Sequence, residues 1–126
     1  MRKPGRGVPA GAAAIASIRR TLAYLSGHVG EPLILRDLAE MAAMSRSHFS
    51  HTFHAVAGMP LSDYVRDLRL KEANYLLLDS GLSITAVAVE AGFYDLPHFD
   101  KNFPQRFDMS PNEFRRRYGL RRNGRR

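Results

Sequence analysis

Residues 91–111 read AGFYDLPHFDKNFPQRFDMSP, and this stretch decides the fold. Phenylalanines recur in it at four-residue steps, at Phe99, Phe103 and Phe107. That spacing places the three rings on one face of a helix, where we expect them to be buried. Asp95 precedes them as a favourable N-cap residue. The stretch therefore predicts a turn followed by an amphipathic helix with an aromatic core face.

The rest of the chain carries further helix signals and almost no strand signals. The first helix is expected over about 12–28, because apolar residues recur there at steps of three and four. Later helices are marked by the N-cap residues Ser45, Ser62, Ser83, Asp95 and Ser110. Ile34 takes the corresponding place before the second helix, and its side chain accepts no hydrogen bond, so that helix is expected to begin less firmly. The pattern predicts an all-α fold of about seven helices.

An internal repeat relates the first half of the chain to the second. At an offset of 50 residues, His48, Phe49 and Phe53 coincide with His98, Phe99 and Phe103. At an offset of 49, Ala39 coincides with Ala88, which leaves a one-residue slip at the turn between them. In each copy a small residue lets two helices cross closely, and an aromatic stripe follows. Two helix-turn-helix units fit this pattern; the alternative is a helical bundle with chance similarity.

The composition excludes several classes of protein. The 126 residues include no Cys, so the chain has no disulfide framework, thiol nucleophile or Cys-ligated metal. No apolar run approaches the roughly 18–20 residues that span a bilayer, so no membrane segment is expected. The sequence shows no Gly-rich phosphate loop and no His–carboxylate cluster, so we expect neither an enzyme nor a cofactor. The net charge of +7 favours a polyanionic partner.

The chain resembles the DNA-binding domain of the AraC/XylS family of bacterial transcription regulators over about residues 12–118. The first copy of the repeat contributes Leu38-Ala39, residues 44–50, Phe53 and Gly58-Met59. The second contributes residues 84–88, Ala91-Gly92-Phe93, the phenylalanines quoted above and Ser110-Pro111. The connector between them, from Tyr64 to Leu77, matches as well.

The resemblance implies two helix-turn-helix subdomains joined by a long connector helix. The expected boundaries are a disordered basic tail at 1–11, a first subdomain at 12–61, a connector at 62–79, a second subdomain at 80–118 and an Arg-rich tail at 119–126. The family also implies a monomer that places two recognition helices in successive major grooves of double-stranded DNA. It further implies a cytoplasmic, nucleoid-associated regulator, an activator that works with RNA polymerase.

In the first recognition helix, the side opposite Phe49 and Phe53 presents hydrogen-bonding side chains suited to base edges and phosphates. By resemblance, the base-reading residues are Arg46, Ser47, Ser50 and His51. Ser45 and His54 are expected at phosphates. His48, His51 and His54 leave a metal site open as an alternative, and a merely solvated polar face is another.

In the second recognition helix, the resemblance makes Leu96, Pro97 and Lys101 the base-reading residues. The phosphate contacts expected there are Asn102, Gln105 and Arg106.

Three residues depart from the family pattern. Asp100 would repel phosphate, and Asp108 replaces the more usual Gly. Pro104 removes the hydrogen bond to the Asp100 carbonyl and is expected to kink or shorten the helix. We therefore expect the first recognition helix to supply most of the sequence specificity.

Two further alternatives concern the role of the chain and of Arg69. A non-specific architectural nucleic-acid binder using its basic ends is the main rival to a sequence-specific regulator, and a helical protein-interaction module is another. Arg69 lies in the connector, where a structural role is favoured over DNA contact; a cap or an ion pair with Glu90 or Asp95 would serve it.

The excess of positive charge lies entirely at the ends of the chain. Met1–Arg6 carries +3 and Arg115–Arg126 carries +7, whereas residues 7–114 carry −3. The reading units are therefore slightly acidic overall, so their specificity must come from a few placed side chains. The Arg-rich ends are suited to a salt-sensitive contribution that is blind to sequence.

Deleting residues 120–126 removes four arginines and tests this division. Binding is expected to weaken by the same factor for all DNA sequences, and the dependence of the binding constant on salt is expected to flatten. Titration of matched duplexes at several salt concentrations measures both. An unchanged salt slope would show that the tail takes no part in binding.

Overall fold

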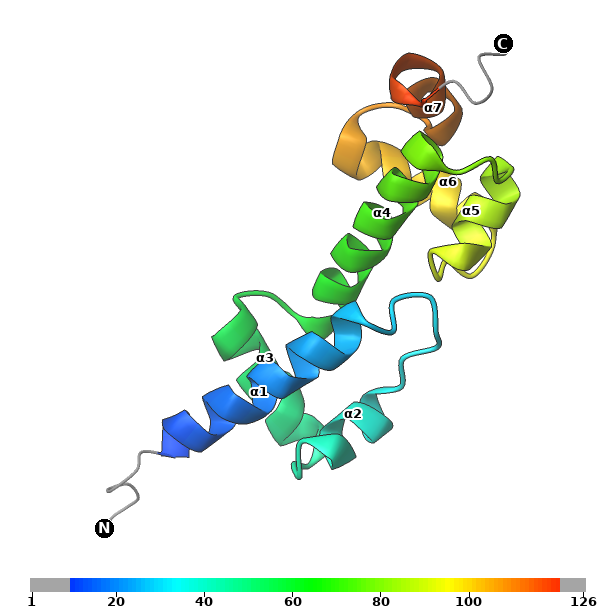
Figure 1. The fold of residues 1–126 in the computed structure, drawn as a ribbon. Helices are drawn as coiled ribbons and strands as arrows, with labels where there is room; N and C mark the ends of the chain where they lie inside the picture. Colours follow the sequence, from blue (N-terminus) through cyan, green and yellow to red (C-terminus); the bar gives the residue numbers. More distant parts are fainter. Residues whose placement is uncertain (1–9, 121–126) are drawn as a thin grey trace. The chain divides into compact units, whose positions relative to one another are not determined.

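The computed structural model describes residues 10–120, and within that range every regular element is a helix (Figure 1). In chain order the seven helices are α1 (Ala10–Ser26), α2 (Leu35–Met41), α3 (Arg46–Ala57), α4 (Leu61–Asp79), α5 (Ile84–Glu90), α6 (Leu96–Phe107) and α7 (Pro111–Tyr118). The all-α class with about seven helices is confirmed. The tails expected at 1–11 and 119–126 lie mostly outside the described residues.

The helix caps follow the sequence pattern at four of the five expected positions. Ser45, Ser83, Asp95 and Ser110 each accept a hydrogen bond from the backbone N–H three residues later. Ile34 makes no side-chain cap, as expected.

The expected cap at Ser62 is wrong, and of the two outcomes expected at Pro104, a kink or a shortened helix, the shortening is wrong. Ser62 is not a cap, because α4 already begins at Leu61 and its first carbonyl acceptor is that of Pro60, bonded by the Tyr64 N–H. Pro104 does not shorten α6, which continues through it to Phe107. A proline costs the helix one backbone hydrogen bond there, and the buried phenylalanines on the same helix hold it against that loss.

The described chain forms two compact units. The first comprises the residues up to His28 together with Pro32–Val65, and the second comprises Val29–Glu31 together with the residues from Arg66 onward. In the first unit, α3 packs against α1 and α2. Its core consists of fully buried side chains, the largest being Ile18, Leu25, Leu38, Phe49 and Phe53.

The core of the second unit repeats this arrangement with different helices. Leu70, Ala73 and Leu77 of α4 are buried with residues of α5 and α6. The side chains that they cover are Val87, Ala88, Ala91, Phe93, Phe99 and Phe103. In this unit α4 therefore takes the place that α1 holds in the first.

The same helix also closes the first unit. Tyr64, near the start of α4, lies edge-on to Phe53 with ring centroids 5.6 Å apart. Phe114 of α7 makes the same edge-on contact with Phe103 in the second unit, at 5.4 Å. The first turns of α4 thus hold in the first unit the place that α7 holds in the second. The later turns of α4 hold in the second unit the place that α1 holds in the first.

Arg115 joins the end of α4 to α7 through backbone carbonyls. Its guanidinium donates to the carbonyl oxygens of Leu76, Leu77, Ser80 and Leu82, the Leu77 bond being 3.1 Å long. The Leu76 oxygen also accepts from the backbone N–H and the hydroxyl of Ser80, so Arg115 matters most to the oxygens of Leu77, Ser80 and Leu82, for which water would be the alternative. Burial lowers the pKa of the Arg115 guanidinium.

Arg69 plays a related part in the second unit. It donates to the carbonyl oxygens of Val29 at 3.2 Å and Glu31 at 3.0 Å. Burial lowers the pKa of its guanidinium. The expected structural role is confirmed, but the partners are carbonyls and not the expected carboxylates of Glu90 or Asp95.

Gly92 makes the Arg69 contact possible. It adopts a φ of +95°, and a Cβ built on it would lie 2.6 Å from the Val29 oxygen and 2.7 Å from Arg69 Nε. The turn before α6 therefore requires glycine both for its backbone conformation and for space.

Replacing Arg115 with methionine tests the carbonyl contacts at the end of α4. The free energy of unfolding is expected to fall by about 2 kcal/mol, because several partly buried carbonyls lose their donor. Urea unfolding followed by circular dichroism measures this. Arg116→Ala, an exposed neighbour on α7, is the control and is expected to leave the unfolding midpoint unchanged. Equal effects of the two substitutions would contradict the assigned role.

Candidate nucleic-acid interface

Helix α3 is fixed at both ends and along its inner face. Ser45 accepts a 3.1 Å hydrogen bond from the His48 N–H, and Gly58 ends the helix with a φ of +84°. Phe49 and Phe53 are fully buried. With the ends and the inner face fixed, the remaining side chains of α3 are held in a defined register on the outer face.

That outer face carries the side chains expected to read DNA. Arg46, Ser47, Ser50, His51 and His54 are all exposed. Ser45 is exposed too, although its hydroxyl oxygen already accepts the cap hydrogen bond. The face offers donors and mixed donor–acceptors and contains no carboxylate.

Helix α6 has the same construction, 50 residues later. The Asp95 carboxylate accepts a 2.9 Å hydrogen bond from the His98 N–H. Phe99 and Phe103 are fully buried, and Asp108 ends the helix with a φ of +62°. Both α3 and α6 contain 12 residues, so their outer faces correspond residue by residue.

The side chains expected to read bases from α6 differ in their exposure to solvent. Pro97 and Lys101 are exposed, whereas Leu96 packs partly against the core of the second unit.

Of the three expected phosphate contacts on α6, two already have partners. Asn102 donates to the His98 carbonyl at 2.8 Å, and the Arg106 guanidinium lies over the Phe107 ring, 5.3 Å from its centroid. Gln105 is exposed and makes no side-chain hydrogen bond within residues 10–120. A phosphate would have to compete for Asn102, whereas a cation over a ring keeps its outer N–H groups available.

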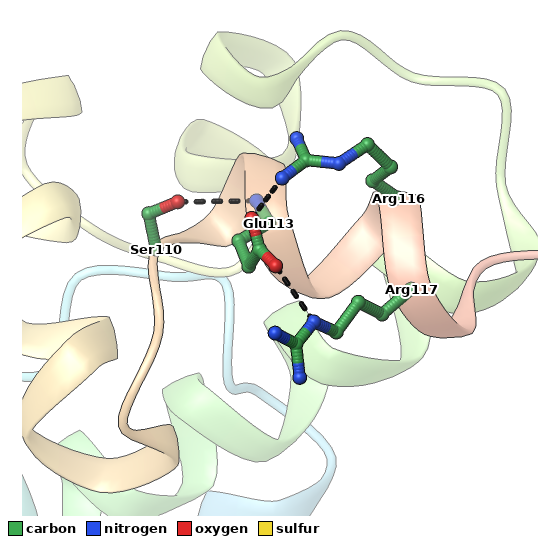
Figure 2. A network of polar contacts seen from close by, with 4 residues as sticks. All are labelled: Ser110, Glu113, Arg116 and Arg117. Carbon is green, nitrogen blue, oxygen red and sulfur yellow. Dashed lines mark hydrogen bonds and ion pairs between the residues drawn. The ribbon is translucent and has the colours of Figure 1, made fainter.

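The arginines of α7 are also engaged, a point that the sequence did not reveal. Glu113, whose backbone N–H is capped by Ser110, pairs with both Arg116 and Arg117 (Figure 2). The hydrogen bond that Arg117 donates to the Glu113 carboxylate raises the pKa of the Arg117 guanidinium. With Arg115 bonded to carbonyls, the three described arginines of the C-terminal region all have partners in the protein. The four that follow lie outside the described residues.

Two further properties bear on the type of site. Within residues 10–120, the structure contains no cluster of three His, Asp or Glu side chains that could hold a metal ion. Over the same range, none of the helices is both long enough and apolar enough to cross a membrane. The expected reading side chains lie on α3 and α6, and all of them except Leu96 are exposed.

A comparison with known families identifies this arrangement. The helix-turn-helix domain family matches residues 38–117, which takes in α3, α6 and the connector between them. The chain belongs to the AraC-type helix-turn-helix family.

Relatives of this AraC-type domain are longer proteins. An uncharacterised HTH-type transcriptional regulator of Haemophilus influenzae is 35% identical over 68% of the chain and 29% of its own length. The HTH-type transcriptional activator RhaR of Klebsiella pneumoniae is 30% identical over 86% of the chain and 39% of its own length. The chain thus spans well under half of these relatives.

Solved structures share the fold. An AraC-type transcriptional regulator from Chromobacterium violaceum superposes with a TM-score of 0.75 at 27% identity, covering 84% of this chain and 95% of that one. The DNA-binding domain of AdpA, a global transcriptional factor solved with a target DNA, gives 0.78 at 27% identity, covering 86% and 98%.

Removing the cap of α3 tests how its reading face is fixed. Ser45→Ala leaves the His48 N–H without its acceptor and is expected to cost about 1 kcal/mol of folding free energy. Ser47→Ala, two residues further on and also exposed, changes no cap and is the matched control. Urea denaturation compares the two variants, and an equal loss in both would show that the Ser45 hydroxyl is not needed to start the helix.

Proposed function

We propose that the chain binds double-stranded DNA in a sequence-specific manner and regulates transcription, with α3 and α6 as its reading helices. The observation that carries the proposal is the residue-by-residue match of two capped helices within an AraC-type domain. Each helix buries a phenylalanine face and turns a different set of polar side chains outward. Two helices with different outward side chains are suited to reading two different DNA half-sites.

The proposed base-reading residues are those expected from the sequence. They are Arg46, Ser47, Ser50 and His51 on α3, and Leu96, Pro97 and Lys101 on α6. The proposed phosphate contacts are Ser45 and His54 for the first helix, and Asn102, Gln105 and Arg106 for the second. The exposure of Arg46, His51 and Lys101 supports their assignment, because base edges can be reached only by side chains that the fold leaves uncovered.

The finer parts of the proposal concern how the domain acts. One chain is proposed to bind as a monomer, with a subdomain at 12–61, a connector at 62–79 and a subdomain at 80–118 bringing two reading helices to successive major grooves. An activator that works with RNA polymerase in the bacterial cytoplasm, on the nucleoid, is the proposed setting. The relative RhaR is named a transcriptional activator, which supports activation over repression.

The competing function is non-specific binding through the basic ends. Of the ten basic residues at the ends, Arg115, Arg116 and Arg117 have partners within the protein and are less available for it, and the other seven lie outside the described residues. A catalytic role has no support, since the family and the relatives are transcription regulators.

Selection of bound duplexes from a random pool tests the proposed function. The expected product is an asymmetric motif with two half-sites about one helical turn, roughly 10 base pairs, apart. A palindromic motif would contradict the monomer. Recovery of no motif, with binding that depends on salt alone, would favour the architectural alternative.

Alanine substitutions rank the two reading helices. Arg46→Ala and His51→Ala are each expected to cost roughly 1–3 kcal/mol of binding free energy on the selected site, and Lys101→Ala less. The reason is that α6 carries Asp100 beside Lys101, whereas α3 carries no acidic side chain. Titration of one duplex at fixed salt gives the three values. A larger loss for Lys101→Ala would reverse the ranking.

A further inference from the structure

Asp100 lies on the exposed side of α6, at the edge of the expected reading face that is nearer the buried phenylalanines. At about 100° per residue, positions 96 and 104 lie about 40° from it on either side, and positions 97 and 101 lie within about 100°. The residue is exposed, while its neighbour Phe99 is fully buried. A carboxylate at this place projects from the same surface as Pro97 and Lys101.

Asp100 has no part in holding the fold. Among residues 10–120, the structure gives its carboxylate no hydrogen bond and no ion pair. The other carboxylate beside α6, that of Asp95, differs because it caps the helix. Stability therefore does not explain why residue 100 is acidic.

The internal repeat gives Asp100 a counterpart with an assigned role. Because α3 and α6 share cap positions, buried phenylalanines and length, Asp100 corresponds to Ser50. Ser50 is among the proposed base-reading residues of α3. By the same register, Lys101 corresponds to His51, which is proposed to read bases as well.

The chemistry of a carboxylate limits what it can contact in DNA. An ionised carboxylate only accepts hydrogen bonds, and phosphate repels it. In the major groove the donors are the N4 amino group of cytosine and the N6 amino group of adenine. Adenine also presents its N7 acceptor beside the amino group, and the partial negative charge on N7 repels a carboxylate. Cytosine has no acceptor of its own on that edge.

We propose that Asp100 is a specificity residue that selects cytosine at one position of the DNA read by α6. The inference rests on the proposed function, since it requires α6 to enter a major groove. The carboxylate accepts a hydrogen bond from cytosine N4 and is repelled where the base offers acceptors alone, as guanine and thymine do. The acidic residue thus narrows the choice of sequence while it lowers the overall attraction to DNA.

Selection from a random duplex pool with the full chain and two variants tests the proposal. Wild-type protein is expected to recover cytosine at one position of one half-site. Asp100→Ser, which installs the residue of the first copy, is expected to reduce the preference for cytosine there roughly tenfold and leave the other positions unchanged. Asp100→Asn is expected to move that preference toward adenine, because an amide pairs with adenine N6 and N7.

A charge-matched control separates base reading from simple repulsion. Glu90→Gln removes one exposed negative charge from α5, outside the proposed reading face, and is expected to leave the recovered motif unchanged. If Asp100→Ser binds every duplex more tightly by one common factor, with the motif intact, Asp100 merely repels phosphate and the proposal is overturned. Failure of the wild-type protein to recover any motif is a different result, which overturns the proposed function and this inference together.

Discussion

The burial of two phenylalanines on each recognition helix is the constraint on which the rest of the structure depends. Phe49 and Phe53 in α3, and Phe99 and Phe103 in α6, are completely removed from solvent. Their four-residue spacing fixes the rotation of each helix about its axis, and the serine or aspartate cap fixes where each helix starts. Once rotation and start are set, the identity of the outward side chains is determined by the sequence alone. A helix-turn-helix protein needs this, because a reading helix that turns by one residue presents different groups to DNA.

Local spacing predicted this part of the fold well, and contacts between distant residues account for what it missed. The caps at Ser45 and Asp95 and the buried phenylalanines follow from patterns only a few residues long. The carbonyl partners of Arg115 are more than 30 residues away in the sequence, and any arginine in a basic run looks alike before the chain is folded.

The wrong expectation of a shortened helix at Pro104 has the same origin. Helix propensity alone predicts that α6 could end there, but packing of Phe103 and Phe107 against each other and against Phe114 offsets one lost hydrogen bond. For the reading residues, sequence and structure together establish exposure and register. Which bases they are proposed to contact depends on the DNA and follows from neither.

The two compact units do not correspond to two consecutive halves of the chain. The second unit includes Val29–Glu31, which precede the whole of α2 and α3, and α4 supplies side chains to both cores. A fragment starting at residue 80 would lack Leu70, Ala73 and Leu77, one wall of its own interior. No single break in the chain yields two complete halves, although the sequence repeats. Neither copy of the repeat is therefore a self-contained stretch of chain, and each unit can vary its outward side chains only while the buried residues of its own core stay as they are.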